Sequence, residues 1–144
     1  MKSNEKKQII TRNDVITSSG SYPERVTSEE LTPEVIENID KLVEVVNSVL
    51  NELNIESIKI SSGFRPSSVN SNISNAAKKS SHMTGEAIDI LDDKDQSIAK
   101  SFTIEVLERY NLYREDYDYT KGKWTNWCHI QIRPTLSGKR IFKP

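Results

Sequence analysis

The sequence predicts an α+β domain with a small, mainly antiparallel sheet and helices packed on one side. Two segments repeat apolar residues at the spacing of an amphipathic helix, over about 33–54 and 96–110. Three shorter segments are rich in β-branched residues and alternate in polarity, at 58–60, 86–91 and 127–132. Together they indicate one sheet covered by two main helices.

The first helix has the clearest start signal. Thr32 can cap it through its hydroxyl, Pro33 suits the first helical position, and Glu34 places negative charge near the positive end of the helix dipole. Apolar residues follow at helical spacing as far as Leu53. We expect this helix to pack the core, and no chemistry is predicted on it.

The remaining segments predict loops and irregular ends. Residues 1–31 predict an irregular arm with at most a short strand or turn, and 32–144 the domain itself. Residues 66–81, rich in Ser, Asn and Lys, and 111–126, rich in aromatics and acids, predict long loops of the kind that often carry function. We expect the tail over 133–144 to run over the surface.

Size and composition exclude several classes of protein. A chain of 144 residues, 35% hydrophobic and 28% charged, suits one globular domain. Its net charge of -1 lacks the basic excess of a nucleic-acid-binding protein, and no apolar run is long enough for a membrane span. The single cysteine, Cys128, cannot form an internal disulfide, and residues 1–11 lack the apolar stretch of a secretory signal peptide.

The chain has two histidines, His82 and His129, and each lies beside or within a predicted strand. A histidine taken alone is more often a hydrogen-bonded structural residue than a ligand, and that interpretation stays open. Asp89 lies between two isoleucines, where its charge needs a partner, either Arg65 or a metal ion. Gly85 lets the backbone turn between His82 and Asp89. Two imidazoles and one carboxylate match a catalytic zinc set, which leaves one position open for a water whose pKa falls to about 7.

Alternation along the predicted strands decides which side chains share a face. His129 and Gln131 lie on one face of their strand and Cys128 on the other, so a buried structural Cys128 is favoured over a ligand or a nucleophile. By the same rule Glu86 points away from Asp89, and we leave it out of the site.

Four short motifs follow one another along the chain: Ser62-Gly63-Phe64-Arg65-Pro66, Val69-Asn70, Ser80-x-His82-x-x-Gly85-x-Ala87-x-Asp89 and Trp127-x-His129. With the closing stretch over 137–144, they resemble the zinc D-Ala-D-Ala carboxypeptidase family over residues 33–144. That family includes phage endolysins that act as L-alanyl-D-glutamate or D-Ala peptidases, and it shares its fold with the hedgehog signalling domain. The resemblance implies the same hedgehog-like fold here.

The resemblance also implies site residues. It implies one zinc ion per chain, held by His82, Asp89 and His129. Arg65 matches the family arginine that holds the substrate or its developing oxyanion, a role that suits a permanent cation with a planar fork of donors. Ser80 matches the motif serine, as a substrate contact or as support for the loop.

One position departs from the family pattern. Well-studied members carry a glutamate, as general base, three residues before the last histidine, where this chain has Asn126, and an amide cannot take up that proton. The acids upstream are Glu115, Asp116 and Asp118. We nominate Glu115 as the general base, against the alternative that these acids only form a solvated loop.

The implied activity is zinc-dependent hydrolysis of an amide bond in peptidoglycan stem peptides, as a D-Ala-D-Ala carboxypeptidase or an endolysin-type endopeptidase. We expect a monomer made in the bacterial cytoplasm that acts at the cell wall after release by other factors, or within a phage particle. Two alternatives stay open. Asn126 keeps open a non-catalytic phage structural or wall-binding protein of the same fold, and a metal-free domain would pair Asp89 with Arg65.

Overall fold

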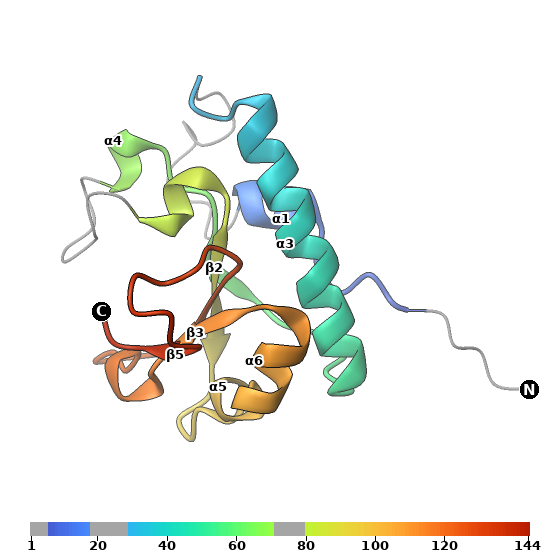
Figure 1. Ribbon diagram of the computed structural model, residues 1–144, viewed down its shortest axis with the longest axis vertical. Coiled ribbons are helices and arrows are strands. Elements are labelled where there is room, and N and C mark those ends of the chain that lie inside the picture. The colour runs from blue at the N-terminus through green and yellow to red at the C-terminus, as the bar shows by residue number, and fades with distance from the viewer. Residues whose placement is uncertain (1–5, 18–28, 71–79) are drawn as a thin grey trace, which may run out of the picture.

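The computed structural model describes residues 6–17, 29–70 and 80–144 (Figure 1). Its sheet has five strands in the order β1-β2-β4-β3-β5. Their bounds are Ile60–Ser62 for β1, Ala87–Asp92 for β2, Tyr113–Glu115 for β3, Asn126–Gln131 for β4 and Ile141–Phe142 for β5. Neighbouring strands are antiparallel except for β3 and β5, which are parallel. The predicted α+β class with a mainly antiparallel sheet is therefore confirmed.

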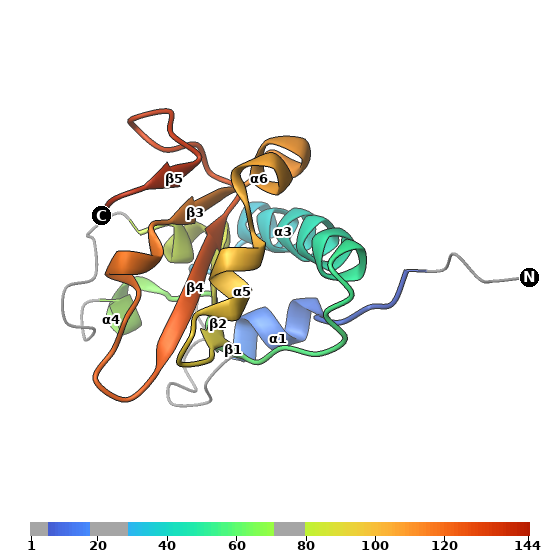
Figure 2. The same ribbon diagram turned by 90° about the horizontal axis from the view of Figure 1, so that it is seen from below.

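The long helix α3 (Pro33–Glu52) closely follows the predicted segment. The Thr32 hydroxyl accepts a hydrogen bond from the backbone N–H of Val35 at 3.2 Å, which is the cap expected from the sequence. Its apolar stripe is buried, and α3 lies on the same side of the sheet as α1 (Arg12–Thr17) and α6 (Ile104–Tyr110) (Figure 2). These helices cover one face of the sheet with apolar side chains.

Strand alternation divides β2 and β4 between the core and the opposite face. Four apolar side chains on the core face of these strands are fully buried: Ile88, Ile90, Cys128 and Ile130. Asp89 and His129 therefore point away from the helices, and they are paired directly across the two strands. The other face of the sheet thus receives the residues that could carry chemistry.

The single helix predicted over 96–110 is wrong, because two helices occupy that segment. Helix α5 (Ser97–Ser101) ends at Phe102, which is fully buried. Thr103 then caps α6, since its hydroxyl accepts a hydrogen bond from the backbone N–H of Val106 at 3.4 Å. A capping threonine with a glutamate two residues later was a signal for this break, but the apolar periodicity concealed it.

The segments predicted as irregular contain further structure. In the arm, residues 12–17 form α1, and Ile10, Val15 and Ile16 lie in the same hydrophobic core as α3. The loop predicted over 66–81 contains the short helix α4 (Ser67–Asn70) and reaches the 3-10 turn η1 (Ser81–Thr84), while its residues 71–79 lie outside the described residues.

The loop predicted over 111–126 and the surface tail also contribute to the sheet. The loop forms β3 and the 3-10 turn η2 (Tyr117–Tyr119), and the tail forms β5. Neither strand has a strong pattern of its own, and both exist because β3 pairs with β4 and β5 with β3. The strand predicted at 58–60 begins two residues later than expected, as β1, since Ile60 pairs with Ile90.

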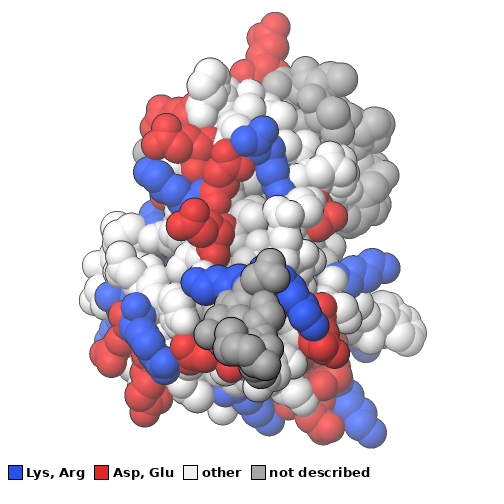
Figure 3. Space-filling model, turned by 90° about the vertical axis from the view of Figure 1, so that its right-hand side faces the viewer, with Lys and Arg blue, Asp and Glu red and all other residues white. Residues whose placement is uncertain are grey.

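Acidic side chains gather over the upper part of the face that α3 presents, and acidic and basic side chains mix below them (Figure 3). Arg12 of α1 pairs with Asp40 of α3 at 2.7 Å, and Lys41 pairs with Glu37 at 3.3 Å. Each of these pairs joins an acid of α3 to a neighbouring base. Among the described residues, none of the helices is long and apolar enough to cross a membrane.

Gly85 allows the turn that carries His82 to pack close against α3. Its φ is +75°, and an added Cβ would lie 2.7 Å from Cγ1 of Ile39 and 2.8 Å from the carbonyl oxygen of Val35. We expect Gly85→Ala to lower the free energy of unfolding by about 2–4 kcal/mol, through left-handed backbone strain and overpacking together. Urea unfolding of the purified variant measures this.

Gly138 is the matched control for that change. Its φ is +76°, but a Cβ there would meet nothing within 4 Å. Gly138→Ala should therefore lower the free energy of unfolding through backbone strain alone, by about 1–2 kcal/mol. Equal losses in the two variants would mean that contact between Gly85 and α3 contributes nothing.

Candidate metal centre and active site

His82 is placed by a capped 3-10 turn. The hydroxyl of Ser80 accepts a hydrogen bond from the backbone N–H of His82 at 3.2 Å and so starts the turn η1. The His82 ring is 2% exposed, and its Nδ1 lies 2.9 Å from the carbonyl oxygen of Gly63. Because a carbonyl only accepts, this contact assigns the ring proton to Nδ1 and leaves Nε2 for Asp89, whose Oδ1 is 3.3 Å away.

Asp89 and His129 are brought together by the register of the central strands. They are direct partners in the β2–β4 pair, and Nδ1 of His129 lies 2.8 Å from Oδ1 of Asp89. The other ring nitrogen, Nε2, lies 2.7 Å from Oε1 of Gln131 on the same strand face. His82, from a turn before β2, thus meets two residues from the middle of the sheet.

The three side chains fit a zinc ion. Their ligand atoms all lie within 4.8 Å of one another, and the two imidazole rings are 5.2 Å apart between centroids. Two ligands on a tetrahedral zinc with bonds of about 2.0–2.1 Å are about 3.3 Å apart. The distance of 3.3 Å between His82 and Asp89 matches this spacing, and the 2.8 Å between Asp89 and His129 is shorter than it. Three protein ligands leave one position for a water or a substrate.

The electrostatics of the centre favour an ionised Asp89. Burial alone would raise the pKa of its carboxyl, but the charge of His82 and hydrogen bonds from both imidazoles hold that pKa far below its usual range. Burial lowers the pKa of His82. Burial is the largest single effect on His129 and opposes its protonation. The hydrogen bonds to Asp89 and Gln131, with the charges of Asp89 and Glu115, together outweigh it and raise the pKa of that ring. An ionised carboxylate between two imidazoles is a complete donor set for a divalent cation.

Arg65 lies beside the centre without pairing with Asp89. Its backbone N–H donates to the carbonyl oxygen of His82 at 3.1 Å, and Nη2 donates to the Ser80 hydroxyl at 3.2 Å. Its Nε is buried and has no hydrogen-bond partner among the described residues. Burial lowers the pKa of Arg65, and the nearby charge of Asp89 opposes this. Asp89 pairs with the two histidines instead, so the Asp89–Arg65 pair expected of a metal-free domain does not form among the described residues.

A family model described as Peptidase M15 matches residues 9–131. The chain belongs to the M15 peptidases. It is therefore a zinc metallopeptidase, and the predicted resemblance is confirmed. No curated protein and no solved structure matches the chain.

In this M15 peptidase, Glu115 lies on the face of the sheet that holds the candidate metal centre. Strand β3 pairs with β4 through Tyr113 with Gln131 and Arg114 with Ile130, and the next step of that register places Glu115 beside His129. Directly opposed residues of neighbouring strands point to the same face. Burial raises the pKa of the Glu115 carboxyl. The charge of His129 lowers this pKa, and the charge of Asp89 raises it. Glu115 is thus half-buried near the centre, whereas Asp118 of the same segment is 67% exposed.

Asn126 has a structural place in the M15 peptidase. Its Nδ2 donates to the carbonyl oxygen of Asp93 at 3.2 Å, and its Oδ1 accepts from the backbone N–H of Gly122 at 3.3 Å. Its odd offset from His129 along β4 directs it to the other face. Asn126 therefore links two turns at the start of β4, away from the candidate metal centre.

Two further contacts of the M15 peptidase were not assigned a role from the sequence. The carbonyl of Gly63 and the amide of Gln131 each bind the outward nitrogen of one histidine. Alternation predicted that Gln131 shares a face with His129, and this was the only available signal. The Gly63 contact depends on backbone geometry, which side-chain patterns do not report.

Proposed function

We propose that this M15 peptidase hydrolyses an amide bond in the peptide stem of bacterial peptidoglycan, with zinc held by His82, Asp89 and His129. The observation that carries the proposal is the convergence of these three ligand atoms within 4.8 Å. The motif resemblance supports peptidoglycan as the substrate, because the motifs that resemble wall peptidases are the ones that build this centre.

The surrounding residues supply the roles that amide hydrolysis needs. A bound zinc ion supplies Lewis acidity and lowers the pKa of water to about 7. Glu115 accepts the proton of the attacking water on its carboxylate and returns it to the leaving amine. Because burial raises the pKa of Glu115, it takes up that proton more readily than an exposed carboxylate does.

Arg65 is suited to the substrate oxygen on which negative charge develops. Its guanidinium is buried, and its Nε is a donor that finds no acceptor in the part of the chain that the structure describes. A fixed donor of this kind stabilises developing charge strongly in a site that excludes water. Ser80, which accepts hydrogen bonds from both Arg65 and the His82 backbone, supports the loop rather than the chemistry.

Cleavage of purified peptidoglycan tests this proposal. We expect the zinc-loaded protein to release products that mass spectrometry can assign, either free D-Ala from a carboxypeptidase or a split stem from an endopeptidase. Chelation should stop the release, and added zinc should restore it. Zinc-loaded protein that leaves stems of different chemistries intact would contradict the proposed substrate and favour the non-catalytic wall-binding alternative.

A further inference from the structure

The His129 ring contacts an oxygen atom through each of its nitrogens. Nδ1 lies 2.8 Å from Oδ1 of Asp89, and Nε2 lies 2.7 Å from Oε1 of Gln131. The nitrogen that faces Gln131 points away from the candidate metal centre. The contact with Gln131 therefore decides which nitrogen remains for a metal.

A second contact sets the direction of the Gln131 amide. Its Nε2 donates to the backbone carbonyl of Arg133 at 2.8 Å. Because a carbonyl oxygen only accepts, the NH2 end of the amide must face Arg133, and Oε1 must face His129. Oε1 is also only an acceptor, so Nε2 of His129 carries the hydrogen. In the neutral ring that a metal ion binds, Nδ1 then holds the lone pair.

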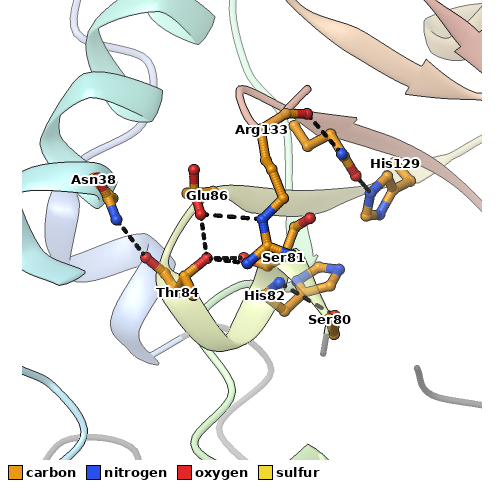
Figure 4. A network of polar contacts seen from close by, with 9 residues as sticks. Asn38, Ser80, Ser81, His82, Thr84, Glu86, His129 and Arg133 are labelled. Carbon is orange, nitrogen blue, oxygen red and sulfur yellow. Dashed lines mark hydrogen bonds and ion pairs between the residues drawn. The ribbon is translucent and has the colours of Figure 1, made fainter. Parts of the chain in front are cut away.

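The side chain of Arg133 binds the end of the turn that carries His82 (Figure 4). Nε of Arg133 lies 3.3 Å from Oε1 of Glu86, and Nη2 donates to the hydroxyl of Thr84 at 3.1 Å. The carbonyl of Thr84 accepts from Nδ2 of Asn38 on α3 at 3.0 Å. Arg133, whose carbonyl orients the amide, is thus bound to the η1 turn, and that turn is bound to α3.

The two histidines are held in opposite tautomers by two carbonyl-type oxygens. His82 donates from Nδ1 to Gly63, and His129 donates from Nε2 to Gln131. We propose that Gln131 is a positioning residue that fixes the orientation and tautomer of His129, so that Nδ1 is the zinc ligand. Acceptors of this kind raise ligand basicity and restrict ring rotation. The inference rests on the zinc site of the proposed function, but not on its substrate.

Gln131→Met tests the inference, because it removes both amide contacts at similar volume. We expect the zinc dissociation constant to rise roughly 10–100-fold, as measured by competition with a chromogenic chelator. Nitrogen NMR of the zinc-loaded parent, labelled in histidine, should give a protonated Nε2 and a metal-bound Nδ1 for His129. In the variant, the Nε2–H signal should lose its protection from solvent exchange.

Gln96→Met is the matched control. Gln96 is 4% exposed, and its amide donates to the carbonyl of Tyr117 at 2.7 Å, away from the candidate metal centre. Its replacement should leave the zinc dissociation constant unchanged while removing an amide of similar burial. This control separates a general loss of stability from a loss of ring positioning.

Gln131→Glu keeps an oxygen toward Nε2–H, and we expect its zinc dissociation constant to stay within about tenfold of the parent value. A Gln131→Met protein with the parent constant and an unchanged Nε2–H signal would overturn the inference. If that variant does not fold, a metal-bound Nε2 in Gln131→Glu would overturn it equally. A parent that binds zinc but leaves peptidoglycan intact would contradict only the proposed substrate, whereas a parent without zinc would overturn both proposals.

Discussion

Alanine in place of His129 is expected to abolish zinc binding and peptide cleavage together. The change removes one of three ligands, and Asp89 keeps only His82 as a partner in the centre. Without zinc, water near neutral pH loses the acidity that the reaction needs, so cleavage should fall by at least about a thousandfold. Metal content after dialysis and the release of stem peptides measure the two effects.

Cys128→Ala is the matched control for this experiment. Cys128 is the next residue on β4 and is fully buried, but it faces the hydrophobic core instead of the candidate metal centre. Burial raises the pKa of its thiol, which keeps it neutral and a poor ligand. This variant should retain its zinc and its activity. A full zinc complement in His129→Ala would contradict the assigned ligand set.

Glutamine in place of Glu115 is expected to slow cleavage by roughly two to four orders of magnitude, because the general base is lost. Zinc affinity should change little, since Glu115 is not among the three residues placed to hold the ion. The effect should appear in kcat rather than KM. In the parent, activity should fall as the pH drops through the raised pKa of Glu115, because only the carboxylate form accepts the proton.

Asp118→Asn is the control for the loss of an acid from the same segment. Its side chain is 67% exposed and lies in the turn η2, so its removal should leave the rate within about twofold of the parent. If Glu115→Gln also stays within about twofold while chelation still stops cleavage, the base is another group.

The helices and strands with strong local patterns could be predicted from the sequence. The apolar stripe and the Thr32 cap predicted α3, because both signals act within one or two helical turns. The alternation that contains Asp89 and His129 predicted β2 and β4 to within one residue at each end. The motif that resembles the zinc peptidases named the three residues that the structure brings together.

The prediction failed where structure depends on a partner distant in the chain. Strands β3 and β5 have only three and two residues, so neither has enough alternation to be recognised. Both form because backbone groups of β4 and then β3 are available for pairing. The break at Phe102 was also missed, because burial of that ring in the hydrophobic core is a tertiary event.

The sequence by itself determined the donor set of this protein: two imidazoles and one carboxylate, each next to a segment with a recognisable period. Only the tertiary structure decided which nitrogen of each ring faces the centre and which acid lies beside it. Those choices depend on the carbonyl of Gly63, the amide of Gln131 and the β3–β4 register that carries Glu115. Hydrogen-bond direction and strand register are set across long separations in the chain, and local patterns do not contain them.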